Sequence, residues 1–228
     1  SVRNKAGKLL TTNDDQFKRW HQHFEETLNF ECATQQAEEE ELRETSSSKI
    51  NSNPPTIAEI RTAIRAMKSG KAAGIDQVAA EMLLADVNLA ADLLFPIFKM
   101  VWEQQKLPED WLQGILVKIP KKGDLSNCNN WRGITLLSIP SKVLTKVILH
   151  RINAKLDESL RKEQAGFRTG RSCIDQINTL RIIIEQMTEY NNPLHLAFVD
   201  YEKAFDRVAR DNIWLALQRR GIPLKLIA

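Results

Sequence analysis

The chain has 228 residues, of which 43% are hydrophobic and 27% charged, a composition typical of a globular protein with a substantial core. No apolar stretch is long enough to cross a bilayer, and the first residues lack the pattern of a signal peptide. The three cysteines are isolated and include no Cys-x-x-Cys pair. A disulfide framework or a zinc site is therefore not expected, and a reducing intracellular compartment is the simplest interpretation.

The net charge of +3 hides an asymmetry between the two halves of the chain. Residues 1–98 carry a net charge of −4, whereas residues 99–228 carry +7. The second half therefore favours a polyanionic partner. An ordinary solvated surface explains the same charge about as well.

The first 55 residues are predicted to hold one helix and one linker. Apolar side chains recur every three or four positions over residues 14–30, which predicts an amphipathic helix capped by Asn13 or Asp14. Residues 36–55 combine a run of glutamates, three serines and a proline pair, which favours a polar linker. We place a domain boundary there, after an N-terminal unit of residues 1–35.

Helices and one β-hairpin are predicted for the next part of the chain. Thr56 and Glu59 are spaced as a capping box, which predicts a helix that runs to about Lys68. An apolar, β-branched run over residues 114–120 predicts a strand, and a polar turn leads from it to a returning strand at 132–138. Two further helices are predicted near residues 77–85 and 88–105.

The rest of the chain is predicted to contain three more helices and one buried strand. A long helix is expected to begin at Pro140, with apolar residues spaced for one buried face. The Ser172-Cys-Ile-Asp175 segment has the spacing of a second capping box, opening a helix that runs to about Glu189. A short apolar run at 194–199 predicts a buried strand, and a final helix is predicted over 210–220.

Asp200 follows that predicted strand directly. A carboxylate at the end of a buried strand is costly unless its charge is used. Rigidly held oxygen ligands suit Mg²⁺, and nucleotidyl transfer employs two such ions. An Asp at a strand end is also a common helix cap. Taken alone, Asp200 is therefore either a metal ligand or the cap of a helix beginning near Glu202.

Four sequence segments give more specific information about the family of the chain than its composition does. They are Ser69-Gly-Lys-Ala-Ala-Gly-Ile-Asp76 with Glu81, Ile119-Pro-Lys-Lys-Gly-Asp124 followed by Asn130-Trp-Arg-Gly-Ile-Thr-Leu-Leu-Ser138, Gln164-Ala-Gly-Phe-Arg-Thr-Gly-Arg-Ser-Cys-Ile-Asp-Gln176, and Phe198-Val-Asp-Tyr-Glu-Lys-Ala-Phe-Asp206. In this order they resemble the reverse transcriptases of non-long-terminal-repeat (LINE-like) retrotransposons, in particular the RTE-like group. The resemblance covers roughly residues 56–228 and, more weakly, 1–30.

The resemblance implies a helix-rich α+β fold with the right-hand architecture of a polymerase. Residues 56–193 would be the fingers and 194–228 the start of the palm. The palm sheet would be incomplete, which would leave a strand edge exposed at 194–200. Residues 1–35 would form a connector helix, and 36–55 the linker behind it.

The resemblance also implies a polymerase site. Asp200 looks like the catalytic metal ligand, assisted by the backbone carbonyl of Tyr201. Lys121 and Arg132 match the fingers cations that grip the incoming triphosphate, where Arg offers a bidentate fork and Lys a mobile point charge. Phe205 matches the bulky residue that leaves no room for a 2′-hydroxyl. The alternatives are a solvated turn for Lys121 and a core aromatic for Phe205.

The segment from Gln164 to Gln176 is implied to contact the nucleic-acid template. Arg168 and Arg171 would contact template phosphates. Gly170 would permit a tight backbone turn, and Phe167 would stack or pack. The alternative for this segment is a capped helix entry with exposed arginines.

The implied activity is that of an RNA-directed DNA polymerase from a retrotransposon, which adds deoxynucleotides to a primer with the help of Mg²⁺. Its partners would be an RNA template, a DNA primer and deoxynucleoside triphosphates, with no membrane. The implied location is intracellular, in the cytoplasm and nucleus. The oligomeric state is left open.

No Asp-Asp pair follows Asp200, although the family has an aromatic-x-Asp-Asp motif well after the first one, and the chain starts without an initiator Met. We therefore expect a fragment that is inactive alone, because one carboxylate cannot hold two Mg²⁺ ions. Two alternatives stay open. They are a non-catalytic RNA- or DNA-binding module derived from a retrotransposon, and a helical interaction protein.

Overall fold

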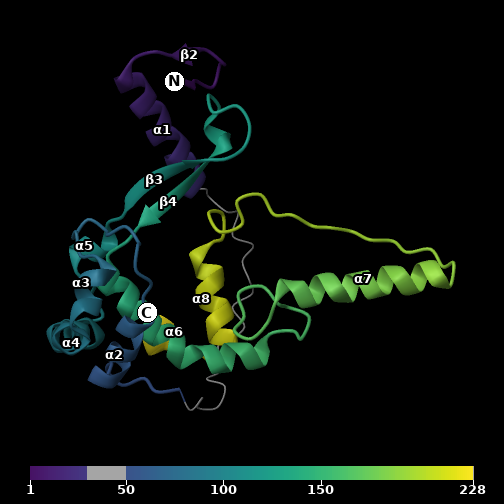
Figure 1. Ribbon diagram of the computed structural model, residues 1–228. Coiled ribbons are helices and arrows are strands. Elements are labelled where there is room, and N and C mark those ends of the chain that lie inside the picture. Colours follow the sequence, from purple (N-terminus) through teal and green to yellow (C-terminus); the bar gives the residue numbers. More distant parts are fainter. Residues whose placement is uncertain (30–49, 228) are drawn as a thin grey trace.

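The computed structural model of the chain describes residues 1–29 and 50–227. It contains a helical body, a β-hairpin that rises from this body, and an N-terminal unit that packs against the hairpin (Figure 1). The predicted helix-rich α+β class is confirmed. Most of the predicted linker at 36–55 lies outside the described residues. No helix in the described part of the chain is long and apolar enough to cross a bilayer.

Five helices make up the helical body: α2 (Ile57–Arg65), α3 (Ala80–Ala85), α4 (Val87–Gln104), α5 (Glu109–Leu112) and α6 (Ile139–Ser159). The helices predicted near 77–85 and 88–105 are confirmed as α3 and α4, whereas the sequence pattern does not predict α5. Helix α2 contacts both α4 and α6. Ile60, Phe98 and Val143, one from each of these three helices, are fully buried. The core of the body therefore lies where the three apolar helix faces meet.

The start of α2 confirms the capping box. The Glu59 amide donates to the Thr56 hydroxyl at 3.2 Å, and the Thr56 amide donates to Glu59 Oε2 at 2.8 Å. Two amide groups that a helix start leaves without partners are thus satisfied at once. The helix ends at Arg65, earlier than the predicted Lys68.

Helix α6 begins at Ile139 rather than at the predicted Pro140. Ser138 is its N-cap, and the Ser138 hydroxyl accepts a hydrogen bond from the amide of Ser141. Pro140 therefore falls in the first turn, where its missing N–H costs nothing. The predicted buried face is confirmed, since Val143, Leu144, Val147 and Ile152 are all buried.

The predicted hairpin is confirmed as β3 (Ile115–Pro120) paired antiparallel with β4 (Trp131–Leu136). At its tip the Lys121 amide donates to the Asn130 carbonyl at 2.7 Å, so the pairing continues into the predicted polar turn. The turn ends in a short 3-10 helix over Cys128–Asn130.

The N-terminal unit consists of β1 (Val2–Arg3), β2 (Leu9–Leu10) and α1 (Asn13–Leu28), with β1 and β2 paired antiparallel. The predicted caps of α1, Asn13 and Asp14, are wrong. Thr12 has the extended backbone of an N-cap, and its hydroxyl accepts from the Asp15 amide at 3.2 Å. Asn13 and Asp14 are already helical, so neither can occupy the cap position.

Aromatic packing fastens α1 to the hairpin. The rings of Trp20 and Trp131 meet edge to face, with centroids 5.5 Å apart, and the Lys118 ammonium lies 4.4 Å from the Trp20 ring centroid. A Cβ added at Gly133 would lie only 2.7 Å from the Phe24 ring. The close approach of α1 to β4 therefore requires glycine at this position.

The C-terminal part contains α7 (Cys173–Glu189), α8 (Arg210–Arg219) and α9 (Leu224–Ile227). The first two agree closely with the predicted helices. Ser172 caps α7 as predicted, but its hydroxyl accepts from the Ile174 amide rather than from that of Asp175. Helix α7 extends away from the body and buries none of its residues (Figure 1).

The predicted buried strand at 194–199 is wrong. This segment forms no strand and returns as an extended chain from the far end of α7 (Figure 1). Phe198 is 82% exposed and Val199 76% exposed. A strand needs a neighbour for its backbone hydrogen bonds. Within residues 1–29 and 50–227 both sheets are two-stranded hairpins that do not include this segment. The division into fingers and palm stays a prediction.

Candidate functional site

A cavity of about 510 Å³ lies between α1, the β3–β4 hairpin and the loop that follows Asp200. We call it the hairpin cavity. Its lining includes the five residues predicted for metal and nucleotide binding: Lys121, Arg132, Asp200, Tyr201 and Phe205. They come from the tip of β3, from β4 and from a loop almost 70 positions later in the sequence. The fold therefore gathers side chains that the sequence keeps far apart.

The two predicted cations lie on the hairpin wall of this cavity. Lys121 follows the last residue of β3, and its ammonium donates to the Asn129 carbonyl at 3.1 Å. Arg132 is the second residue of β4 and stands opposite Ile119. Its exposed guanidinium has no hydrogen bond or ion pair with any part of the chain that the structure describes. Arg132 is therefore free to bind an anion that enters the cavity.

The opposite wall is the loop over residues 200–206. Lys203 has a left-handed backbone, φ +51°, and its carbonyl accepts from the amides of Asp206 and Arg207 at 3.0 Å each. This tight turn brings Asp200, Tyr201 and Phe205 to the same cavity. Asp200 does not cap a helix, since no helix begins between the end of α7 at Glu189 and the start of α8 at Arg210.

Sequence reasoning missed Lys203, which fastens this loop to α1. Its ammonium donates to the Thr27 hydroxyl at 3.2 Å, and that hydroxyl in turn donates to the His23 carbonyl at 2.7 Å. Lys203 and Thr27 are 176 positions apart. The sequence offered one signal for a role of Lys203, which is its position between Asp200 and Phe205 in the 198–206 segment.

The carboxylates of the hairpin cavity do not make a metal site by themselves. Glu202 and Asp206 line the cavity together with Asp200, but Glu202 lies 3.9 Å from the Arg207 guanidinium. Among the residues that the structure describes, no three His, Cys, Asp or Glu side chains converge on a point suitable for a metal ion. Mg²⁺ requires near-octahedral oxygen coordination. Asp200 and the Tyr201 carbonyl supply too few ligands for two ions.

The four residues predicted to contact a template are placed differently from one another. Arg168 donates to Asp157 at 2.7 Å and also to the carbonyls of Arg161 and Gln164, and its side chain is only 6% exposed. This guanidinium holds the pKa of the Asp157 carboxyl below its usual value. In this structure Arg168 therefore closes the loop that follows α6. The exposed Arg171 makes no side-chain hydrogen bond within the described residues.

Phe167 and Gly170 have left-handed backbones, with φ +58° and φ +73°. Phe167 is 97% exposed, yet its ring meets the Phe205 ring edge to face, with centroids 5.7 Å apart. Nothing lies within 4 Å of a Cβ added at Gly170. The turn itself, rather than a close approach, thus explains glycine there.

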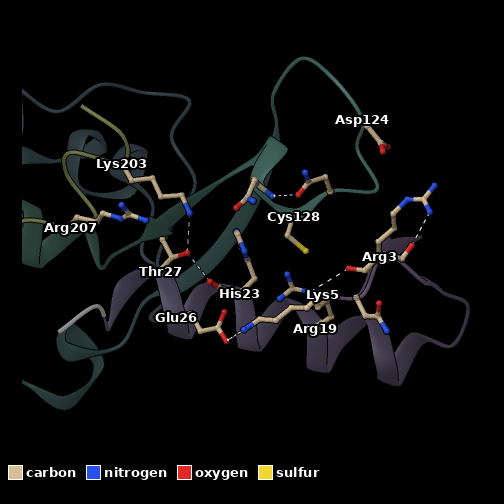
Figure 2. Close-up of a pocket in the computed structure, with 14 residues that line it drawn as sticks. Arg3, Lys5, Arg19, His23, Glu26, Thr27, Asp124, Cys128, Lys203 and Arg207 are labelled. Carbon is tan, nitrogen blue, oxygen red and sulfur yellow. Dashed lines mark hydrogen bonds and ion pairs between the residues drawn. The ribbon is translucent and has the colours of Figure 1, made fainter. Parts of the chain in front are cut away.

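A second cavity of about 740 Å³ lies beside the first, between the N-terminal unit and the loop at the hairpin tip (Figure 2). We call it the N-terminal cavity. Four residues line both cavities: His23, Thr27, Asn129 and Lys203. Burial and, after it, the positive charges of Lys203 and Arg19 lower the pKa of His23 from 6.5 to about 4. His23 is therefore neutral at pH 7.

Comparison with known proteins gives the relationships of the chain. Residues 119–228 match the model of the family described as reverse transcriptase (RNA-dependent DNA polymerase). An uncharacterized 149 kDa protein of transposon TX1 from Xenopus laevis is 31% identical over 159 residues, which is 68% of this chain and 12% of that protein. A probable RNA-directed DNA polymerase from transposon BS of Drosophila melanogaster is 28% identical over 219 residues, 93% of this chain and 24% of that protein.

A third relative is the retrovirus-related Pol polyprotein from the type-1 retrotransposable element R2 of Popillia japonica. It is 32% identical over 116 residues, 51% of this chain and 16% of that polyprotein. The chain thus spans between 12% and 24% of the length of these three relatives.

Proposed function

Because the chain belongs to the reverse-transcriptase family of non-long-terminal-repeat retrotransposons, we propose that it forms the nucleotide-binding part of an RNA-directed DNA polymerase. Residues 56–193 serve as fingers and residues 194–228 as the start of the palm. The hairpin cavity receives the incoming deoxynucleoside triphosphate. Polymerisation itself belongs to a longer protein, as in the relatives.

One observation carries this proposal. Five residues chosen from the sequence, in three separate segments, line a single cavity of about 510 Å³. Two of them are cations, one is a carboxylate, and two are aromatic. This is the combination that a nucleotide needs, because it carries a charged triphosphate and an apolar sugar face.

The hairpin wall suits the triphosphate. Arg132 has an unengaged guanidinium fork that matches two phosphate oxygens at once. The Lys121 ammonium is held only by the neutral Asn129 carbonyl, so its charge is not compensated. Both cations project from a paired hairpin, which holds them in place before the ligand arrives.

The loop wall suits the sugar and the reacting end. Phe205 lines the cavity, where its bulk rejects an additional 2′-hydroxyl. Asp200 and the Tyr201 carbonyl offer oxygen atoms of the kind that Mg²⁺ prefers. Because the described residues supply no further ligands at that point, we assign no step of the reaction to a metal ion held by this chain alone.

Nucleotide binding tests the proposal directly. Trp131 lines the hairpin cavity, so the tryptophan fluorescence of the purified chain reports on a ligand that enters it. We expect deoxynucleoside triphosphates to quench this fluorescence and Arg132→Gln to weaken binding about tenfold, the loss of one charge-assisted contact.

Arg65→Gln is the matched control, since Arg65 is an exposed arginine on α2 that does not line the cavity. Binding that both substitutions weaken equally would show a general charge effect, and it would remove the hairpin cavity as the nucleotide site.

A further inference from the structure

The N-terminal cavity, of about 740 Å³, has a strongly basic lining. Five cationic side chains line it, against only two acidic ones, so the lining alone carries a net charge of +3 with His23 neutral. The whole chain of 228 residues has the same net charge. Figure 2 shows Lys203 and Arg207 at one end of the cavity and Arg3 at the other.

Both acidic residues of the lining already have partners. Glu26 accepts from the Lys5 ammonium at 2.6 Å. Asp124 accepts from the amide and the hydroxyl of Ser126 at 2.9 and 2.8 Å. These hydrogen bonds lower the pKa of both carboxyl groups. Neither acid makes an ion pair with Arg3, Arg19 or Lys203.

Three cations of the lining have no carboxylate partner among the described residues. Arg3 donates to the Ser126 hydroxyl at 2.9 Å and to a carbonyl, and Lys203 donates only to the Thr27 hydroxyl. Arg19 makes only long hydrogen bonds, of 3.4 Å to the Arg3 carbonyl and 3.5 Å to Gln22. An anion can replace these neutral acceptors, because it offers the cations an opposite charge as well as a hydrogen-bond acceptor.

The pKa of the buried His23 is lowered first by burial and then by the nearby cations. It lies in the cavity wall, where Lys203, Arg19 and Lys121 all disfavour its protonation and only Glu26 favours it. The part of this shift that comes from the cations has the sign that favours an anion in the cavity.

We propose that the N-terminal cavity is a binding site for phosphate groups, separate from the nucleotide site. A cavity of about 740 Å³ holds more than one phosphate group, so the ligand is a polyphosphate chain or consecutive phosphates of a nucleic-acid strand. This site goes beyond the proposed function, since it uses the N-terminal unit rather than the hairpin cations. Arg3, Arg19 and Lys203 carry it from three different parts of the fold.

The test measures binding of inorganic tripolyphosphate and, separately, of a short single-stranded RNA to the purified chain by calorimetry. Arg19→Gln is expected to weaken binding about tenfold and to reduce the slope of log affinity against log salt by about one. Lys18→Gln is the matched control, because Lys18 is the neighbouring cation on α1, pairs with Asp14 and does not line the cavity. Circular dichroism and melting check that each variant folds.

Arg132→Gln separates this site from the nucleotide site. Binding that survives Arg132→Gln and is lost with Arg19→Gln supports the proposal, whether the nucleotide test succeeds or fails. If Arg19→Gln weakens only the binding of tripolyphosphate, the ligand is a free polyphosphate. If it weakens only the binding of RNA, the ligand is a nucleic-acid strand. Equal effects of Arg19→Gln and Lys18→Gln, complete loss with Arg132→Gln, or no binding of either ligand would overturn it.

Discussion

The Phe167 ring meets the Phe205 ring edge to face, with centroids 5.7 Å apart and ring planes at 81°. Thirty-eight positions separate the two residues along the chain, and both are otherwise largely exposed. The contact joins the segment predicted to meet the template to the residue predicted to exclude a 2′-hydroxyl. Edge-to-face aromatic pairs hold each other in a defined orientation.

The pair predicts that Phe167 influences the choice of sugar through Phe205. Phe205→Val removes the bulk from the cavity, so we expect the affinity of the chain for ribonucleotides to approach its affinity for deoxynucleotides. Phe167→Ala should shift the same ratio in the same direction but less, because the Phe205 ring remains and only loses its support. The measurement is the ratio of dissociation constants for a matched ribo- and deoxynucleoside triphosphate. Phe17→Ala, which removes an exposed aromatic residue on α1 outside both cavities, should leave the ratio unchanged.

The second prediction concerns the clamp that Arg151 makes inside the helical body. Its guanidinium donates twice to Glu59, at 2.7 Å each, and also to the carbonyls of Asn51, Asn53 and Pro54. The side chain is 5% exposed. Arg151→Met leaves these acceptors unpaired, and it should lower the free energy of unfolding by about 2 kcal/mol. Chemical denaturation measures this difference, and the surface substitution Arg65→Gln should change it by less than about 0.5 kcal/mol.

The third prediction is a loss of stability in mild acid that depends on His23. The folded state lowers the pKa of His23 from 6.5 to about 4, so protons bind the unfolded chain preferentially. The stabilisation is complete above pH 6.5 and is lost as the pH falls from 6.5 towards 4. In His23→Gln the free energy of unfolding should depend less on pH across this window.

Glu59 serves as the internal reference for this measurement. Its pKa is lowered to about 2, chiefly by the hydrogen bond from Arg151, so its stabilisation is lost only below pH 4.5. The wild type and His23→Gln should therefore show the same acid dependence below pH 4. An unchanged slope between pH 6.5 and 4.5 in His23→Gln would contradict the assignment.

The fourth prediction is that the chain alone does not synthesise DNA. Asp200 and the Tyr201 carbonyl supply too few ligands for the two Mg²⁺ ions that nucleotidyl transfer employs. A primer-extension assay with an RNA template, a DNA primer and Mg²⁺ should show no product above that of Asp200→Asn. Robust synthesis that disappears in Asp200→Asn would refute the prediction and make the chain a polymerase in its own right.

Local sequence signals predicted much of this fold. The capping box at Thr56, the apolar face of α6 and the polar turn between β3 and β4 each depend on residues close together in sequence, and all are confirmed. The apolar run at 194–199 failed because its interpretation assumed a neighbouring strand, which the run itself cannot specify.

In the candidate site, too, local motifs were predicted and contacts between distant segments were not. The motif resemblance selected Lys121, Arg132 and Asp200, which share a cavity in the fold. It assigned no role to Lys203, whose bond to Thr27 crosses 176 positions, and it missed the basic lining that the N-terminal unit contributes. Contacts between distant segments have no periodicity or spacing in the sequence, so only the folded chain reveals them.

Lys203 stands in the wall of both cavities. One ammonium group carries a single positive charge, so an anion that draws it to one side leaves less attraction on the other. We therefore expect ligands of the two proposed sites to weaken each other's binding by the same factor, because linkage between two binding sites is reciprocal. The turn around Lys203 thus places one side chain where it can contact a ligand in either cavity, and it couples two ligands that do not touch each other.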